Sequence, residues 1–401
     1  MLFEALRHEA ADGAAWDPVV VAAAIRALVA DFEDHFDPAD FWTAHPLDLE
    51  GEKNSCFHSL YLGASGVLWA MWHLAREGAV QLRGRPEAVI GRVYDSYLDR
   101  PDTDSVVPSY YLGEVGILLI LWRMTGDPVA AERLHARIRD NIPNPTHEAL
   151  WAAPGTMVGA LHMFEWTSEE RWRELFLENV EQLWKTWLPS PHADCDLWTQ
   201  DLYGSVVQLL GAGHGFAGNV YPLLRGASLL PAERRVALYR RCAATLAATA
   251  LREDDGVNWP PGVGPTRPGR ASVLMQWCHG APGIVAATAG FPVGLSAGLD
   301  ELLLAAGEAT WKAGPLAKGY GLCHGTAGNG YAFLKLHRRT GDARWLERAR
   351  AFAMHALAQR ERMRAEHGCG RYNLWTGDAG LAVYLHHCLG AADGLPGLDL
   401  L

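Results

Sequence analysis

The stretch KGYGLCHGTAGNGYAFLKLHRRTG, residues 318–341, decides the fold because it shows one repeat unit in complete form. Gly325 and Gly328 stand three residues apart, and the helix-like run 329–339 follows them at once. The same pattern recurs as GASG at 63–66, GEVG at 113–116, GFAG at 215–218, GAPG at 280–283 and GDAG at 377–380, with a degenerate copy, AAPG, at 152–155. This repetition at uneven spacing predicts an irregular array of seven units.

Two kinds of helix are predicted to alternate along these units. The runs that follow the small-residue pairs, such as VLWAMWHLA (67–75) and ILLILWRM (117–124), are apolar nearly all round, which is typical of buried helices. The longer segments between them place apolar residues at i, i+3, i+4 and i+7 with charges opposite, as in 17–36, 168–188, 231–252 and 342–363. Ser168, Asp127 and Asp342 are the expected N-caps.

Neither set of helices can bury its apolar surface alone. We therefore expect an inner ring of seven buried helices inside an outer ring of seven amphipathic ones. The predicted fold class is all-α, an α/α toroid, and residues 1–401 are predicted to form a single domain. The paired glycines would allow close backbone approach where each inner helix begins, and they would gather seven loops at one end of the ring.

Composition narrows the functional classes. Hydrophobic residues make up 49% of the chain and charged residues 20%, which excludes a disordered chain. The net charge of -11 argues against a nucleic acid partner. We find no apolar stretch long enough for a transmembrane helix and no secretory signal at the N-terminus. Seven cysteines without a C-x-x-C pair favour reduced thiols in a cytoplasmic protein, with peripheral attachment to a membrane left open.

Two units carry a Cys-His pair at matching positions, in QWCHGAPG (276–283) and LCHGTAG (322–328). Adjacent units of a ring bring equivalent positions together, so Cys278 and Cys323 should meet at the mouth with His279, His324 or both. Thiolate and imidazole ligands suit Zn²⁺, and three protein ligands leave a fourth position for water or substrate. The alternative is that these are buried free cysteines of the core.

A titratable pair is predicted beside these cysteines. His214, in GAGHGFAG (211–218), precedes the glycine pair of the unit next to Cys278, where its imidazole could relay a proton. Glu148, in HEALW (147–151), occupies the equivalent approach of the unit before. The alternatives are a helix-start histidine bonded to backbone and a surface glutamate.

The strings NWPPGVGPTRPGRASVLMQWCHGAPG (258–283) and KGYGLCHGTAGNGYAFLKL (318–336) closely resemble the lanthionine synthetase C-like family, which includes bacterial lanthipeptide cyclases and eukaryotic-type members. The resemblance implies an α/α toroid with one zinc ion held by Cys278, Cys323 and His324. It also implies that His214 is the active-site histidine, and it aligns Glu148 with an aspartate of the bacterial cyclases.

The same resemblance bears on substrate binding. Lys318 matches a lysine that contacts glutathione in eukaryotic-type members. His279 belongs to the motif without being implied as a metal ligand, and both residues are predicted to bind substrate. The bacterial cyclases place an arginine shortly before the first cysteine. This chain has Ser272 to Gln276 there, with Arg270 further back, which departs from the cyclase pattern.

These features imply a zinc-dependent conjugate addition. A substrate thiol, whose pKa is about 8.5 when free, loses its proton on the metal and adds to a dehydroalanine or dehydrobutyrine residue. His214 would protonate the resulting enolate, leaving a thioether. The partner is expected to be a dehydrated peptide or protein. The thiol comes either from a cysteine of that peptide or from glutathione.

Two other functional classes stay open. An α/α-toroid glycosidase would need paired carboxylates at the ring mouth, and the available residues are Asp194, Asp196, Asp201 and Asp378. A glutathione-binding or non-catalytic member of the family would use zinc only to hold the fold.

Overall fold

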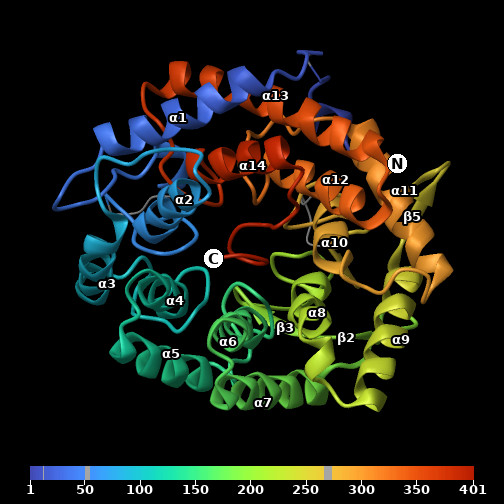
Figure 1. Ribbon diagram of the computed structural model, residues 1–401. Helices are drawn as coiled ribbons and strands as arrows, with labels where there is room; N and C mark the ends of the chain where they lie inside the picture. The colour runs from blue at the N-terminus through green and yellow to red at the C-terminus, as the bar shows by residue number, and fades with distance from the viewer. Residues whose placement is uncertain (12, 50–54, 266–272) are drawn as a thin grey trace.

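The computed structural model describes residues 1–11, 13–49, 55–265 and 273–401, and within them the α-helices form two concentric rings (Figure 1). The seven inner helices are α2 (Ala64–Arg76), α4 (Glu114–Thr125), α6 (Ala153–Thr167), α8 (Phe216–Arg225), α10 (Ala281–Thr288), α12 (Thr326–Thr340) and α14 (Asp378–Gly390). The seven outer helices are α1 (Pro18–Asp34), α3 (Ile90–Asp99), α5 (Pro128–Asp140), α7 (Glu170–Thr186), α9 (Ala232–Thr249), α11 (Ala297–Ala313) and α13 (Ala343–His367). The predicted α/α toroid is confirmed.

The two rings follow from the residue patterns. Inner helix α4 buries every residue from Glu114 to Leu121, because a neighbour covers each of its faces. Outer helix α5 buries only the stripe formed by Ala130, Ala131, Leu134 and Ile138, and its charged residues face away. Helix α5 packs on α4, α7 on α6 and α13 on α12. Helix α14 packs against both α1 and α2, so the last unit closes the ring against the first.

Two of the three expected N-caps are confirmed. The carboxylate of Asp127 accepts from the backbone N–H of Val129, and that of Asp342 accepts from Arg344. The expectation for Ser168 is wrong. Its φ of 57° places it in the left-handed region, and its N–H donates to the carbonyl of Phe164, so Ser168 ends α6 rather than beginning α7.

Short antiparallel strands, which the sequence analysis did not predict, precede α8 and follow α9 along the chain. They are β1 (Leu188–Pro189), β2 (Asp196–Leu197), β3 (Gln200–Leu202), β4 (Ser205–Leu209), β5 (Leu251–Glu253), β6 (Gly256–Asn258) and β7 (Gly262–Val263). Strand β4 is central in its sheet, with Gln200 opposite Val207 and Gln208 opposite Val263. Single 3₁₀ turns cover Ala5–Arg7, Pro46–Asp48, Pro86–Ala88 and Ala227–Leu229.

The closing glycine of each repeat unit is required by close packing. A Cβ at Gly116 would lie 2.1 Å from the carbonyl oxygen of Tyr110 and 3.0 Å from Cβ of Leu60, which belongs to the neighbouring unit. At Gly283 a Cβ would lie 1.7 Å from the carbonyl oxygen of Trp277. Each inner helix therefore begins in direct contact with the loop that leads into it, and only glycine leaves the space.

The C-terminal segment enters the centre of the ring (Figure 1). The hydroxyl of Tyr110 donates to the carbonyl of Gly397 at 2.6 Å, and that of Tyr221 donates to the Asp399 carboxylate at 2.9 Å. Lys335 Nζ lies 2.9 Å from the same carboxylate. Two inner helices, α8 and α12, and the loop before α4 thus hold this segment on the axis.

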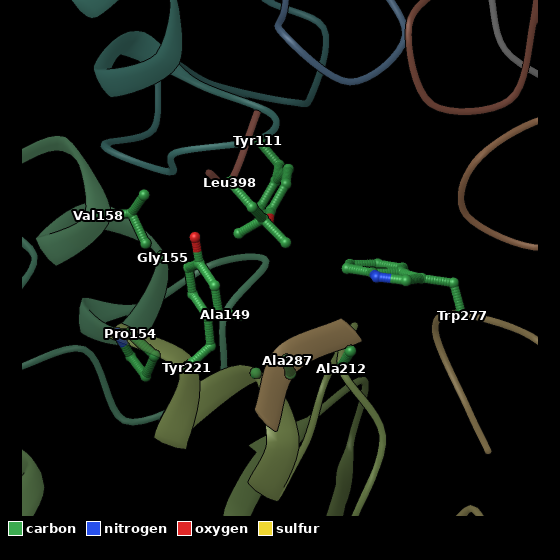
Figure 2. Close-up of a pocket in the computed structure, with 11 residues that line it drawn as sticks. Tyr111, Ala149, Pro154, Gly155, Val158, Ala212, Tyr221, Trp277, Ala287 and Leu398 are labelled. Carbon is green, nitrogen blue, oxygen red and sulfur yellow. The ribbon is translucent and has the colours of Figure 1, made fainter. Parts of the chain in front are cut away.

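A small cavity lies between this segment and the loops at one end of the ring. Figure 2 shows the cavity at the axis, around which Tyr111, Tyr221, Trp277 and Leu398 gather. Its volume is about 10 Å³, which is at the lower limit for one water molecule.

The sequence also predicts reduced thiols and no transmembrane helix. All seven cysteines, which lie within the described part of the chain, have free thiols. No helix among the described residues combines the length and apolar character that a bilayer crossing requires.

The packing of the closing glycines predicts the effect of Gly116→Ala. The added methyl group would meet backbone, so the free energy of unfolding should fall by about 1–3 kcal/mol, as for other overpacked cores. The matched control is Gly91→Ala, near the start of α3, where nothing lies within 4 Å of an added Cβ. That change should raise stability by up to about 1 kcal/mol. Urea unfolding followed by circular dichroism checks both, and equal stabilities would contradict the packing argument.

Candidate functional site

Neighbouring loops at one end of the ring are joined by backbone hydrogen bonds between equivalent positions, each the fifth residue before a closing glycine. The bonds run from Gly213 N–H to Cys278 C=O (3.1 Å), Cys278 to Cys323 (3.0 Å), Cys323 to Trp375 (2.8 Å), Trp375 to Tyr61 (3.2 Å) and Tyr61 to Tyr111 (3.0 Å). Cys278 and Cys323 are therefore direct neighbours across adjacent units.

This register brings three possible metal ligands together. The ligand atoms of Cys278, Cys323 and His324 all lie within 4.8 Å of one another. Both cysteines are 7% exposed, whereas His324 is partly exposed. Within the described ranges, no other group of three or more His, Cys, Asp and Glu residues meets this spacing. Two sulfurs and one imidazole nitrogen form a donor set that fits zinc in a site with one open position.

The two thiols do not ionise independently. The Cys323 thiol and His324 donate to Cys278, and these hydrogen bonds outweigh burial and hold the pKa of Cys278 well below its ordinary value. The hydrogen bond and charge of Cys278, together with burial, raise the pKa of Cys323 well above it. Ionisation of one thiol therefore opposes ionisation of the other, because their sulfurs share one buried site.

Each sulfur also has a neutral hydrogen-bonding neighbour that the sequence analysis missed. Gln276 Nε2 lies 3.0 Å from Cys278 Sγ, and the hydroxyl of Tyr61 is hydrogen-bonded to Cys323. The repeat register could have identified Tyr61, because it occupies the same position before its closing glycine as the two cysteines. Trp375 shares that position, and its ring stacks on Tyr61 at 5.8 Å.

The predicted pair His214 and Glu148 is formed. His214 Nδ1 lies 2.8 Å from Glu148 Oε2, and the buried carboxylate also accepts from the backbone N–H groups of Leu150 and Trp151. Burial opposes protonation of His214. The hydrogen bond and charge of Glu148, with a contribution from Cys278, outweigh burial and raise the pKa of His214. Glu148 is therefore not a surface residue, and His214 is bonded to a side chain rather than to backbone.

The two residues predicted to bind substrate lie near different groups of this centre. The ring of His279 is 6.0 Å from that of His214, measured between centroids. Lys318 is exposed, and its positive charge acts on Cys323. Arg270 and Ser272, which were noted in comparison with the bacterial cyclases, fall outside the described residues.

Of the four carboxylates considered for a glycosidase, Asp196 and Asp378 have separate partners. Asp196 accepts from Arg241 at 2.9 Å, and Asp378 accepts from the hydroxyl of Tyr320 at 2.6 Å. Asp201 pairs with Val206 in the β3–β4 hairpin.

A pocket of about 340 Å³ opens beside His214 and His279. Strand β4 contributes Val207 and Leu209 to its wall. Its other lining residues are Leu202, Tyr203, Ser205, Gln208, Pro260, Pro261, Gly262, Val263, Gly264, Pro265 and Leu274. None of the described lining residues is Asp, Glu, Lys or Arg. The pocket is therefore largely apolar, with the two imidazoles as its main polar groups, and its size suits one or two amino acid residues.

Comparison with known proteins gives consistent findings. The family profile described as "Lanthionine synthetase C-like protein" matches residues 57–393. The glutathione S-transferase LANCL1 of Danio rerio is 34% identical over 194 residues, which are 47% of this chain and 43% of that protein. The LanC-like protein GCL1 of Arabidopsis thaliana is 49% identical over 82 residues, which are 20% of this chain and 19% of that protein. The chain thus matches less than half the length of either relative.

Among solved structures, a nisin cyclase superposes with a TM-score of 0.62. The match covers 85% of this chain and 91% of that chain at 17% sequence identity. This likeness concerns the fold, and it agrees with the two concentric rings of helices.

The His214–Glu148 contact predicts a change in titration for Glu148→Gln. The pKa of His214 should fall below its ordinary value, because burial still opposes the charged imidazole while the carboxylate charge is gone. NMR titration of the imidazole measures this. Glu178→Gln, at a surface carboxylate 3.5 Å from Arg139, should leave the titration unchanged.

The same contact predicts a pH-dependent contribution to folding. Since the pKa of His214 is raised in the folded state, the stabilisation is complete below pH 6.5 and is lost as the pH rises through the folded pKa. Identical His214 titrations in Glu148→Gln and the parent chain would contradict this account.

Proposed function

Because the chain belongs to the lanthionine synthetase C-like protein family, we propose that it catalyses zinc-dependent addition of a thiol to a dehydroalanine or dehydrobutyrine residue of a peptide. The observation that carries this proposal is the convergence of Cys278, Cys323 and His324 within 4.8 Å. The hydrogen-bonded pair His214 and Glu148 lies in neighbouring loops at the same end of the ring.

Cys278, Cys323 and His324 would hold the zinc ion. Two thiolates balance the charge of a divalent cation, and the neutral imidazole completes a set of three ligands. When bound, zinc supplies a Lewis acid that favours the thiolate form of a thiol substrate. The burial of both sulfurs and their closeness to His324 support this assignment of the cofactor.

His214 is proposed to supply the proton that completes the addition. A carbon–sulfur bond forms at the β-carbon of the dehydro residue, the double bond's electron pair moves to the α-carbon side, and the enolate must take up a proton. Glu148 raises the pKa of the imidazole, which favours its protonated form, and would fix its orientation through Nδ1, leaving Nε2 to donate. The proton released by the attacking thiol restores the imidazolium, so the reaction consumes no other reagent.

The acceptor peptide is proposed to lie in the apolar pocket beside His214 and His279. The described lining residues offer no cation for a carboxylate, whereas apolar side chains next to the dehydro residue would bury surface there. His279 is proposed to contact the acceptor, because it lines the pocket together with His214.

The thiol donor has two candidates. Lys318 places a positive charge near Cys323, which suits a donor that carries carboxylates, and the Danio rerio relative bears the name of a glutathione S-transferase. Both observations support glutathione as donor. A cysteine of the same peptide is the second candidate, in line with the nisin cyclase fold.

The proposed function predicts metal-dependent thioether formation. The zinc-loaded protein should convert a dehydroalanine peptide either to a glutathione adduct or to an isomer of unchanged mass whose own cysteine is blocked. Mass spectrometry with and without glutathione distinguishes the donors. Removal of the metal with a chelator should abolish both reactions, and added zinc should restore them, with circular dichroism reporting that the fold is kept. Full activity without metal, or no addition of either thiol, would overturn the proposal.

The acceptor pocket predicts different effects at two adjacent positions of β4. Val207→Lys would place a cation in the apolar pocket and should lower kcat/KM for the dehydro peptide about tenfold or more. Val206→Lys is the matched control, because Val206 is 73% exposed on the other face and lies opposite Asp201. Equal kcat/KM values for the two variants would show that the acceptor peptide does not bind in this pocket.

A further inference from the structure

We propose that Gln276 and Tyr61 are positioning residues of the metal centre, each donating one uncharged hydrogen bond to one of the two cysteine sulfurs. Gln276 Nε2 lies 3.0 Å from Cys278 Sγ, and the Tyr61 hydroxyl is hydrogen-bonded to Cys323. The inference rests on the proposed zinc site and concerns how this chain adjusts the ligands that would hold the ion.

The backbone holds Tyr61 in place on both sides. Its N–H donates to the carbonyl of Tyr111 at 3.0 Å, and its carbonyl accepts from Trp375 at 3.2 Å. The phenol ring stacks on Trp375 with an interplanar angle of 6°. Because Trp375 also accepts the backbone N–H of Cys323, the phenol and the sulfur that it contacts are anchored to one residue.

A tight turn holds Gln276 in a similar way. Its N–H donates to the carbonyl of His279 at 3.1 Å, and the N–H of His279 donates back to the carbonyl of Gln276 at 3.2 Å. Cys278 lies inside this turn, so the amide of Gln276 folds over its sulfur. The two sulfurs thus receive matching support from two unrelated segments of the chain.

The chemistry of these donors suits metal-binding thiolates. A hydrogen bond to an ionised acceptor is stronger than one between neutral groups, so each donor would fix its thiolate in a preferred orientation. Neither donor carries a positive charge, so neither one cancels the charge that attracts the cation. Such outer partners usually affect metal affinity about 10- to 100-fold.

Metal titration of Tyr61→Phe and Gln276→Leu tests the proposal without any substrate. Each variant should bind zinc about tenfold more weakly or worse in competition with a chromophoric chelator. With Co²⁺ in place of zinc, the sulfur-to-metal charge-transfer band should move to longer wavelength, because the sulfur lone pairs lose a stabilising hydrogen bond.

Tyr111→Phe is the matched control. Tyr111 occupies the position of Tyr61 in the next loop and packs edge-on against Trp375 at 5.2 Å, and no hydrogen bond to either sulfur is found for it among the described residues. Its zinc affinity and Co²⁺ spectrum should match those of the unmodified chain. If Tyr61→Phe and Gln276→Leu match it as well, the proposal is overturned.

The outcomes also separate this proposal from the proposed function. An unmodified chain that binds neither Zn²⁺ nor Co²⁺ would overturn the inference together with the proposed cofactor. A chain that binds both ions, shows the expected changes in the two variants and adds no thiol to a dehydro peptide would overturn the proposed function alone.

Discussion

The backbone hydrogen bond from Cys278 to the carbonyl of Cys323, 3.0 Å long, is the contact on which the candidate site depends. It belongs to a series that links equivalent positions of neighbouring loops, and it fixes the spacing of side chains that are 45 residues apart in sequence. A residue type placed at this position in two consecutive units is therefore brought next to itself in space. The fold converts a repeat in sequence into a pair of adjacent sulfurs.

A second close contact, at the same end of the ring, explains the glycines. Each loop turns back onto the helix that it leads into and leaves no room for a side chain where that helix begins, as the carbonyl of Trp277 shows at Gly283. Outer helix α5 shows the other pattern, because its charged surface needs only a single apolar stripe. The closing glycines thus mark the end of the ring that carries the candidate site.

Particular residues show how far sequence could predict this structure. The outer helices were predicted because they carry a helical period, and the inner ones because an apolar run follows each pair of small residues, whereas strands as short as Gly262–Val263 carry no usable period. Ser168 was misassigned because only Ser168 and Glu169 separate α6 from α7, so a serine that ends one helix was assigned to the start of the next. The approach of Cys278, Cys323 and His324 was expected from their register, but Gln276 was missed because its contact depends on a local turn. The single domain and the roles of the site residues stay predictions.

The C-terminal segment around Asp399 would limit how the proposed peptide substrate is handled. Tyr110, Tyr221 and Lys335 fasten this segment across the middle of the ring, and the cavity between Leu398 and the loops of the candidate site has a volume of only about 10 Å³. Under the proposed function, a peptide with several reactive positions would therefore enter and leave at the loop end of the ring, which favours repeated docking over continuous threading.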